Sequence, residues 1–236
     1  NYKVTPGFST PDWAKGAIFY QIYVDRFANG DPSNDVLNRE YIYIKEPSKK
    51  IDDWYCYPEQ MDVRNFYGGD LQGVLDHLDY LKELGVDVIY LNPIFVSPSN
   101  HKYDIQDYDY IDPHYGKIVV DEGNTLPDWE NNNMNASKYI SRVTDKRNLE
   151  ASNEFFIHFV EEVHKKGMRV ILDGVFNHCG SFNKWMDAER IYENQYGYEK
   201  GAFVDANSPY RHFFKFYNQN AWPYNDDYDG WWGHKT

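Results

Sequence analysis

The sequence predicts an α/β protein built on a parallel sheet. Three short segments rich in β-branched and aromatic residues have the character of buried strands: 17–24, 86–91 and 168–172. Two amphipathic segments, 71–84 and 152–166, carry apolar residues at three- and four-residue steps and are expected to be helices. Strands that alternate with helices in this way pair in parallel through right-handed crossovers.

Local signals set the limits of these elements. Asp70 is an N-cap residue for the first helix, and Gly85 follows its last turn. Gly167 ends the second helix directly before the third strand. Residues 36–66 show no periodicity and are expected to form a long loop. The connection 92–150 is longer still, and we expect its Asn-rich second half to be a surface excursion.

Polar residues follow the third strand. Asp173, Asn177 and His178 stand where barrels of alternating strands and helices build their active sites, at the carboxyl ends of the strands. An ordinary strand followed by a polar loop has the same appearance, so position alone leaves both interpretations open.

Composition restricts the class of ligand. The formal net charge of −13 disfavours nucleic acid, whose phosphates need a basic surface. Aromatic residues make up 18% of the chain and include 22 Tyr and 7 Trp, side chains on which sugar rings stack. No apolar run is long enough for a membrane span, so we expect no membrane partner. The compartment stays open, with the cytoplasm slightly favoured over secretion.

Neither cysteine indicates a metal or redox site. Cys56 and Cys179 are far apart and belong to no CxxC pair, which argues against both a zinc site and a disulfide framework.

A compact turn after the first strand has the residue types of a calcium loop. It contains four oxygen-bearing side chains within seven residues: Asn29, Asp31, Asn34 and Asp35. Calcium takes six to eight oxygen ligands from carboxylates, amides and carbonyls. A solvated turn would use the same residues, because Asn, Asp, Gly and Pro are common turn formers. The loop is not an EF-hand, since that motif's Gly and Glu positions are absent.

Five segments, in the same order along the chain, resemble the alpha-amylase family of glycoside hydrolases. They are Ala17–Asp35, Phe66–Gly73, Tyr90–Phe95, Ser99–Asp104 and Asp173–His178. Within the family the chain is most similar to neopullulanases and cyclomaltodextrinases. The resemblance implies a TIM (β/α)8 barrel with a protruding domain B after its third strand.

The resemblance also assigns roles to single residues. His101, Tyr103 and His178 match residues that hold the sugar at the bond to be cleaved, with Tyr103 as the stacking platform. Asp173 matches a carboxylate that orders the site. Two further matches, Gly68 through its carbonyl and Asp70, would complete a Ca²⁺ site with the four residues of the turn. Asn177 is left as a structural residue.

The catalytic residues are expected downstream of this stretch. Retaining glycosidases use two carboxylates roughly 5 Å apart, and neither family motif that carries them is present here. We therefore divide the chain into an N-terminal part of the barrel, 1–173, and a domain B-like excursion, 174–236. The rest of the barrel is expected beyond residue 236, as a partner of this stretch. Without it, we expect this stretch to be inactive.

These expectations give one main function and two alternatives. The first is the N-terminal portion of a hydrolase of α-1,4-linked glucans such as starch, maltodextrins, cyclodextrins or pullulan. The second is a non-catalytic glucan-binding homologue, and the third is a transglycosylase of the same family that makes cyclodextrins or isomerises its substrate. A homodimer is compatible with the resemblance, although the N-terminal domain through which such proteins often dimerise does not precede Asn1.

Overall fold

A three-stranded parallel sheet organises the molecule. The computed structural model describes residues 5–218 and 223–230. Its central sheet has the order β1 (Phe19–Ile22), β6 (Val88–Leu91), β9 (Arg169–Leu172). These strands are the three that the sequence predicts, and all pair in parallel. The first is shorter than expected, because the chain turns into a 3-10 helix at Val24–Arg26.

The first predicted helix is two helices, α1 (Leu71–Asp76) and α2 (Leu78–Glu83). His77 interrupts it, because its ring Nδ1 lies 2.7 Å from the Gly73 carbonyl that its own N–H would otherwise use. That N–H bonds to the Val74 carbonyl instead. The predicted N-cap is confirmed, since Asp70 accepts the Gly73 N–H at 2.6 Å.

The long connection is more regular than predicted. It contains the antiparallel strands β7 (Phe95–Val96) and β8 (Asp107–Ile111) and the helix α3 (Ser137–Thr144). The expectation that its Asn-rich half is only a surface excursion is wrong, because α3 buries Tyr139 and Val143 in a hydrophobic cluster.

The last helix begins earlier than its periodicity indicates. Helix α4 spans Lys146–Lys165, and Asp145 caps it by accepting the Arg147 N–H. Asn148 and Ser152 are buried polar residues in its first turns, and they interrupt the apolar pattern on which the prediction rests.

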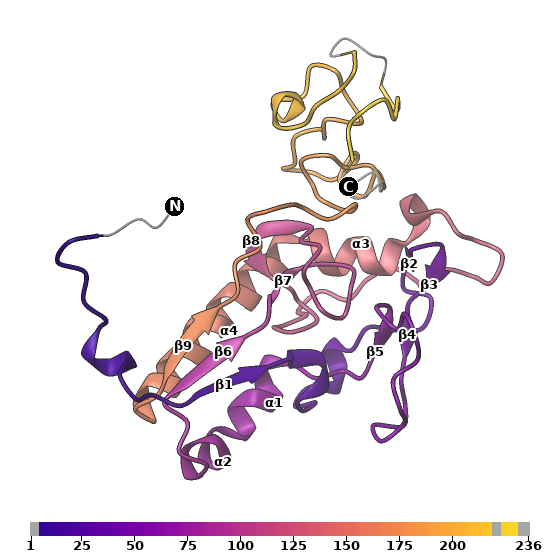
Figure 1. Cartoon of the computed structure of the whole chain (residues 1–236). Coiled ribbons are helices and arrows are strands. Elements are labelled where there is room, and N and C mark those ends of the chain that lie inside the picture. The colour runs from indigo at the N-terminus through magenta and orange to yellow at the C-terminus, as the bar shows by residue number, and fades with distance from the viewer. Residues whose placement is uncertain (1–4, 219–222, 231–236) are drawn as a thin grey trace.

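The predicted loop 36–66 contains four two-residue strands. β2 (Ile42–Tyr43) pairs with β3 (Glu46–Pro47), and β4 (Lys49–Lys50) pairs with β5 (Asn65–Phe66). In Figure 1 these strands lie beyond the carboxyl end of β1, at the side of the molecule away from the N-terminus.

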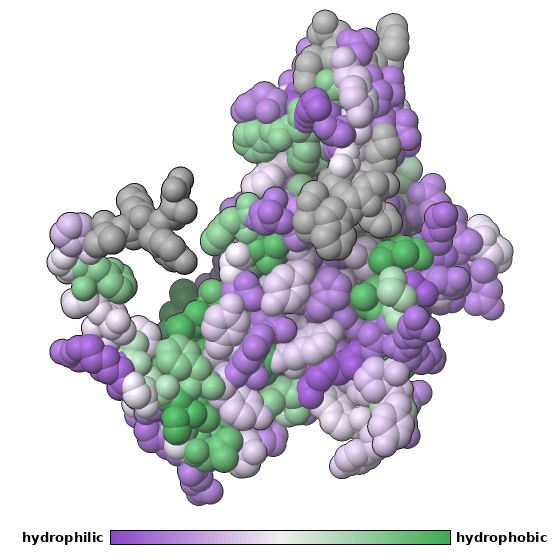
Figure 2. All heavy atoms as spheres, in the orientation of Figure 1, coloured by the Kyte–Doolittle hydropathy of each residue, from purple (hydrophilic) through white to green (hydrophobic). Residues whose placement is uncertain are grey.

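The helices cover one face of the sheet only. Ile22, Ile89 and Leu91 pack with residues of α1, α2 and α4 in the main core. On the opposite face Phe19 is 47% exposed and Gln21 is exposed. Figure 2 shows apolar side chains at the surface near the place where these strands begin. In a complete domain a second layer normally packs against such an apolar face of a sheet.

Residues after β9 form an irregular lobe that stands beyond the carboxyl end of the sheet (Figure 1). The lobe has a small core of its own, made by Met186, Ala202, Phe216 and Tyr228. At its base Phe182 and Tyr192 join the second cluster beside α3. Residues 219–222 and 231–236 of the expected excursion lie outside the described residues.

Across the described parts of the chain, no helix has both the length and the apolar character needed to cross a membrane.

Candidate functional site

Two of the predicted sugar contacts meet at the carboxyl edge of the sheet. The Tyr103 hydroxyl donates a hydrogen bond of 2.6 Å to Asp173 Oδ2. Asp173 directly follows β9, and its N–H bonds to the Leu91 carbonyl of the neighbouring strand. Burial and the Asp173 carboxylate raise the pKa of Tyr103 to about 12, so the phenol keeps its proton and remains the donor. Both side chains are only half-buried, so a ligand can reach them.

His101 is held as a neutral imidazole beside this pair. Its Nδ1 lies 3.1 Å from the Tyr103 N–H, which can only donate, so the proton of the ring is on Nε2. Burial lowers the pKa of His101. Its ring centroid lies 6.0 Å from that of Tyr103. A neutral ring with a free Nε2–H suits a hydrogen bond to a sugar hydroxyl.

His178 belongs to the same region. It follows Asp173 in the turn after β9. Its carbonyl accepts a hydrogen bond of 2.6 Å from the Tyr108 hydroxyl, which also reaches the Val175 carbonyl. Tyr108 thereby fixes the turn after β9. The structure therefore brings together His101, Tyr103 and Asp173, and His178 lies on the turn that follows Asp173.

Sequence reasoning missed Lys102, the residue that anchors this loop from behind. Lys102 is 1% exposed and has a φ of +61°, a conformation that favours glycine. Its Nζ donates to Asp112 Oδ2 at 2.6 Å and to the Ser97 carbonyl at 2.8 Å, and it lies 4.8 Å from the Tyr115 ring centroid. A lysine between two predicted sugar contacts gives no sequence signal that it points inward.

Asp112 continues the buried charge network. Its second oxygen lies 2.8 Å from His114 Nδ1, and His114 Nε2 lies 2.8 Å from Glu40. Burial alone would raise the pKa of Asp112, but Lys102 and His114 bring it well below its usual range. The loop of His101 and Tyr103 is thus fixed to the protein interior through paired charges.

Part of the predicted calcium loop has the features of a cation site. Two buried oxygens there have no partner, Asn29 Oδ1 and Asn34 Oδ1, and beside them lies the buried Asp35 Oδ2. The last lies 2.6 Å from Lys50 Nζ in an ion pair. A Cβ atom at Gly68, whose φ is +85°, would collide with Asp35 and Asn29. Buried oxygens without donors are what an oxygen-binding cation would use.

The other predicted ligands have protein partners. Asp70 accepts the N–H groups of Gly30, Asp31 and Gly73, while Asp31 forms an ion pair of 2.9 Å with Lys117. The loop is therefore joined to the start of α1 through Asp70. Among the described residues no three His, Cys, Asp or Glu side chains gather as a metal site, so an ion here would need amide and carbonyl oxygens in addition to carboxylates.

Asp25 is a second buried organiser that sequence reasoning missed. Its carboxylate accepts the N–H groups of Tyr67 and Gly68, and it pairs with Arg26 at 2.9 Å. It thereby positions the Gly68 carbonyl proposed as a ligand. The only available signal was its place directly after the first predicted strand.

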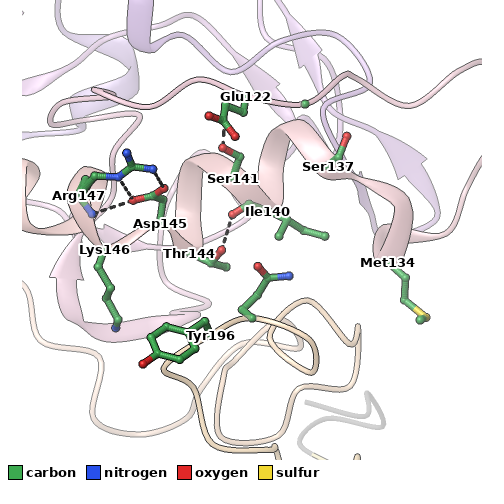
Figure 3. A pocket seen from close by; sticks show the side chains of 12 residues that line it. Glu122, Met134, Ser137, Ile140, Ser141, Thr144, Asp145, Lys146, Arg147 and Tyr196 are labelled. Carbon is green, nitrogen blue, oxygen red and sulfur yellow. Dashed lines mark hydrogen bonds and ion pairs between the residues drawn. The ribbon is translucent and has the colours of Figure 1, made fainter.

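A separate pocket lies at the junction of α3 and α4 (Figure 3). Its volume is about 700 Å³, and its walls include Ile140, Lys146 and Tyr196. The hydrogen bonds drawn in Figure 3 join its walls to one another, as Thr144 to the Ile140 carbonyl and Arg147 to Asp145. None of the predicted sugar contacts lines it.

Comparison with known proteins agrees with these observations. The family model "Alpha amylase, catalytic domain" matches residues 21–122 and 151–236. An amylopullulanase of Thermoanaerobacter thermohydrosulfuricus is 36% identical over 95% of this chain and 14% of its own length. Neopullulanase 2 of Thermoactinomyces vulgaris is 40% identical over 73% of this chain and 21% of its own length.

The fold comparison gives the same relationship. The type III pullulan hydrolase from Thermococcus kodakarensis has a TM-score of 0.66 and 29% identity over 98% of this chain and 34% of its own. The cyclic alpha-maltosyl-(1→6)-maltose hydrolase from Arthrobacter globiformis has a TM-score of 0.59 and 30% identity over 97% of this chain and 38% of its own. This chain spans between about a seventh and two fifths of these relatives, and it belongs to the alpha-amylase family of catalytic domains.

Proposed function

We propose that the chain is the N-terminal portion of a retaining glycoside hydrolase that acts on α-1,4-linked glucans. The observation that carries this proposal is the hydrogen bond of Tyr103 to Asp173 at the carboxyl edge of a parallel sheet, with the His101 ring beside Tyr103. The relatives support the substrate class, since they include a pullulan hydrolase and a cyclic alpha-maltosyl-(1→6)-maltose hydrolase.

In this proposal β1, β6 and β9 are the first three strands of a TIM barrel, and residues 174–236 form a domain B-like excursion. Two observations support it. The strand order is that of successive barrel strands, and one sheet face carries exposed apolar side chains. The partner that covers this face is the rest of the barrel, which also supplies the nucleophile and the general acid.

The proposed role of the present residues is to bind and orient the sugar. Tyr103 offers its ring as a stacking platform, and Asp173 fixes that ring through the phenol. His101 and His178 donate to sugar hydroxyls, and such hydrogen bonds strengthen toward the transition state. Lys102 fixes the loop of His101 and Tyr103 from the inside.

We also propose that the loop after β1 holds Ca²⁺. The residues that would hold it are Asn29, Asp31, Asn34, Asp35, Gly68 and Asp70. The unpaired buried oxygens of Asn29 and Asn34, beside the buried carboxylate of Asp35, support the proposal. When bound, the ion would tie this loop to the start of α1, a structural role that takes no part in bond cleavage.

Glucan binding by the purified protein tests the function. We expect calorimetry to detect binding of maltoheptaose, and Tyr103→Ala to weaken it roughly tenfold through loss of the platform. Tyr103→Phe keeps the ring and should lose less. Tyr80→Ala, which removes an exposed tyrosine from α2, is the matched control. Equal affinity in wild type and Tyr103→Ala would refute the assigned cleft, and absence of wild-type binding would refute the function.

A hydrolysis assay tests the role of the missing barrel. The chain alone should release no reducing sugar from pullulan or maltoheptaose, because the two catalytic carboxylates are expected outside it. Measurable release by the chain alone, lost in Asp173→Asn, would show that this stretch carries its own catalytic group.

A further inference from the structure

Two tyrosines stand almost fully in solvent on one loop. Tyr55 is 91% exposed and Tyr57 is 93% exposed, in the loop between β4 and β5. This loop protrudes below these strands in Figures 1 and 2. Scattered apolar side chains on a surface need no explanation, but two aromatic rings that flank one anchored residue offer a shaped surface.

The loop is fastened to the protein between the two rings. The Tyr67 hydroxyl donates to the Cys56 carbonyl at 3.0 Å and lies 3.2 Å from the Cys56 sulfur. The Trp54 ring packs edge-on against Tyr67, with centroids 5.9 Å apart. Cys56 therefore faces inward, and its two tyrosine neighbours face outward.

A continuous series of ring contacts joins this anchor to the proposed cleft. The Arg26 guanidinium lies 4.2 Å from the Tyr67 ring centroid and 5.5 Å from that of Tyr23. The Tyr23 hydroxyl donates to Asn100 Oδ1 at 2.6 Å, and Asn100 precedes His101 in the chain.

A second set of contacts joins the end of this loop directly to Asn100. The Asn100 side chain donates to the Asp62 carbonyl at 2.8 Å, and its N–H bonds to the Val63 carbonyl. Arg26 also pairs with Asp62 at 2.8 Å. The middle of the loop is thus linked to Asn100 through Tyr67, Arg26 and Tyr23, and its end contacts Asn100 directly.

The charge of the loop selects the kind of ligand. Residues 52–62 contain four acidic side chains and no lysine or arginine: Asp52, Asp53, Glu59 and Asp62. An anionic ligand or a nucleic acid is disfavoured there. A neutral sugar stacks its C–H faces on the tyrosine ring and accepts hydrogen bonds from the tyrosine hydroxyl.

We propose that Tyr55 and Tyr57 form an outlying subsite for the same α-glucan chain that occupies the cleft at Tyr103. A long glucan then contacts both places, whereas a short one fills the cleft alone. This inference rests on the proposed function, and it adds a determinant of the preferred chain length.

The test compares two oligosaccharides by calorimetry on the purified protein. Tyr55→Ala/Tyr57→Ala should bind maltoheptaose about tenfold more weakly than wild type and maltotriose within about twofold of it. Trp129→Ala removes an aromatic ring that is 80% exposed in the long connection, and it should change neither affinity. Melting curves should be unchanged in both variants, because the removed rings bury almost no surface.

Each remaining outcome decides against the subsite. Equal weakening of both oligosaccharides would place the effect in the cleft, and unchanged maltoheptaose binding would leave the tyrosines without a role in sugar binding. A wild-type dimer in sedimentation that the double variant dissociates would assign the loop to self-association. Wild-type protein that binds neither sugar would overturn the proposed function itself, whereas intact wild-type binding with an insensitive double variant overturns only this inference.

Discussion

Replacement of Lys102 by Met tests whether a buried charge holds the sugar-binding loop in place. Met retains most of the apolar stem, so the change removes chiefly the ammonium group. That group bonds to Asp112 and to the Ser97 carbonyl in a site where the lysine is 1% exposed. Removal of one member of a buried ion pair costs about 3–5 kcal/mol, because the other charge is left without its partner.

The structure favours the lower end of that range. Asp112 still has His114 and the Ser97 N–H after the lysine is lost. We therefore expect Lys102→Met to lower the free energy of unfolding by about 3 kcal/mol. This corresponds to a decrease in Tm of roughly 6–12 °C for a chain of this length.

Urea denaturation measures this prediction against a surface pair. Lys166→Met removes a lysine from an exposed ion pair with Asp79, and it should cost less than about 1 kcal/mol. If Lys102→Met is as stable as the surface control, Lys102 is not the anchor described here.

Three further predictions concern the calcium loop, the lobe and the interior charges. Excess chelator should lower the Tm of calcium-loaded protein, and a ligand at a hundred times its Kd accounts for about 2.7 kcal/mol. Burial raises the pKa of Asp187 to about 7, so this residue's contribution to stability is full below its unfolded pKa of about 4 and is lost as pH rises to 7. Asp187→Asn should remove this loss and stabilise the protein by up to about 4 kcal/mol at pH 8 and little at pH 4. The carboxylates of Glu40 and Asp112 raise the pKa of His114 despite its burial, so stability should fall as pH rises from about 6.5 through that raised pKa, and His114→Gln should flatten this fall.

Melting curves and pH series with matched controls decide these cases. Calcium should no longer raise the Tm of Asp35→Asn, whereas Asp79→Asn should respond like wild type. An identical melting curve with and without chelator contradicts the calcium site. The gain in free energy of unfolding from Asp187→Asn has to grow with pH. A gain that is the same at every pH would indicate a change in packing instead. The same alkaline slope in His114→Gln as in wild type would exclude His114 as its cause.

The sheet could be predicted because its signals are local. Each strand is a short apolar run, and Asp70 and Gly85 mark the first helix by cap chemistry alone. Helix α3 could not be predicted from an Asn-rich segment, because its stability comes from burial of Tyr139 and Val143 against distant residues. The break at His77 likewise depends on where one ring nitrogen finds a carbonyl.

The candidate site was predictable only in part. The resemblance assigned His101, Tyr103, Asp173 and His178 to one site, and the contacts of Tyr103 with Asp173 and His101 are compatible with that assignment. The buried charges Lys102, behind the loop of His101 and Tyr103, and Asp25, behind Gly68, were not predictable, since a charged side chain gives no sign in the sequence of pointing inward. Their positions depend on partners far along the chain, such as Tyr67 for Asp25.

The strand register has a consequence for how the chain folds. Val88 pairs with Phe19 on one side and with Arg169 on the other, so each strand pairing closes a loop of about 70 to 80 residues. Closure of such loops costs chain entropy before strand pairing contributes any stability. Contacts between residues so distant in sequence therefore slow folding. Helices α1 and α2 can form early from local contacts, but β6 has to wait for both neighbours. The central strand should therefore be the slowest segment to gain protection from hydrogen exchange during refolding.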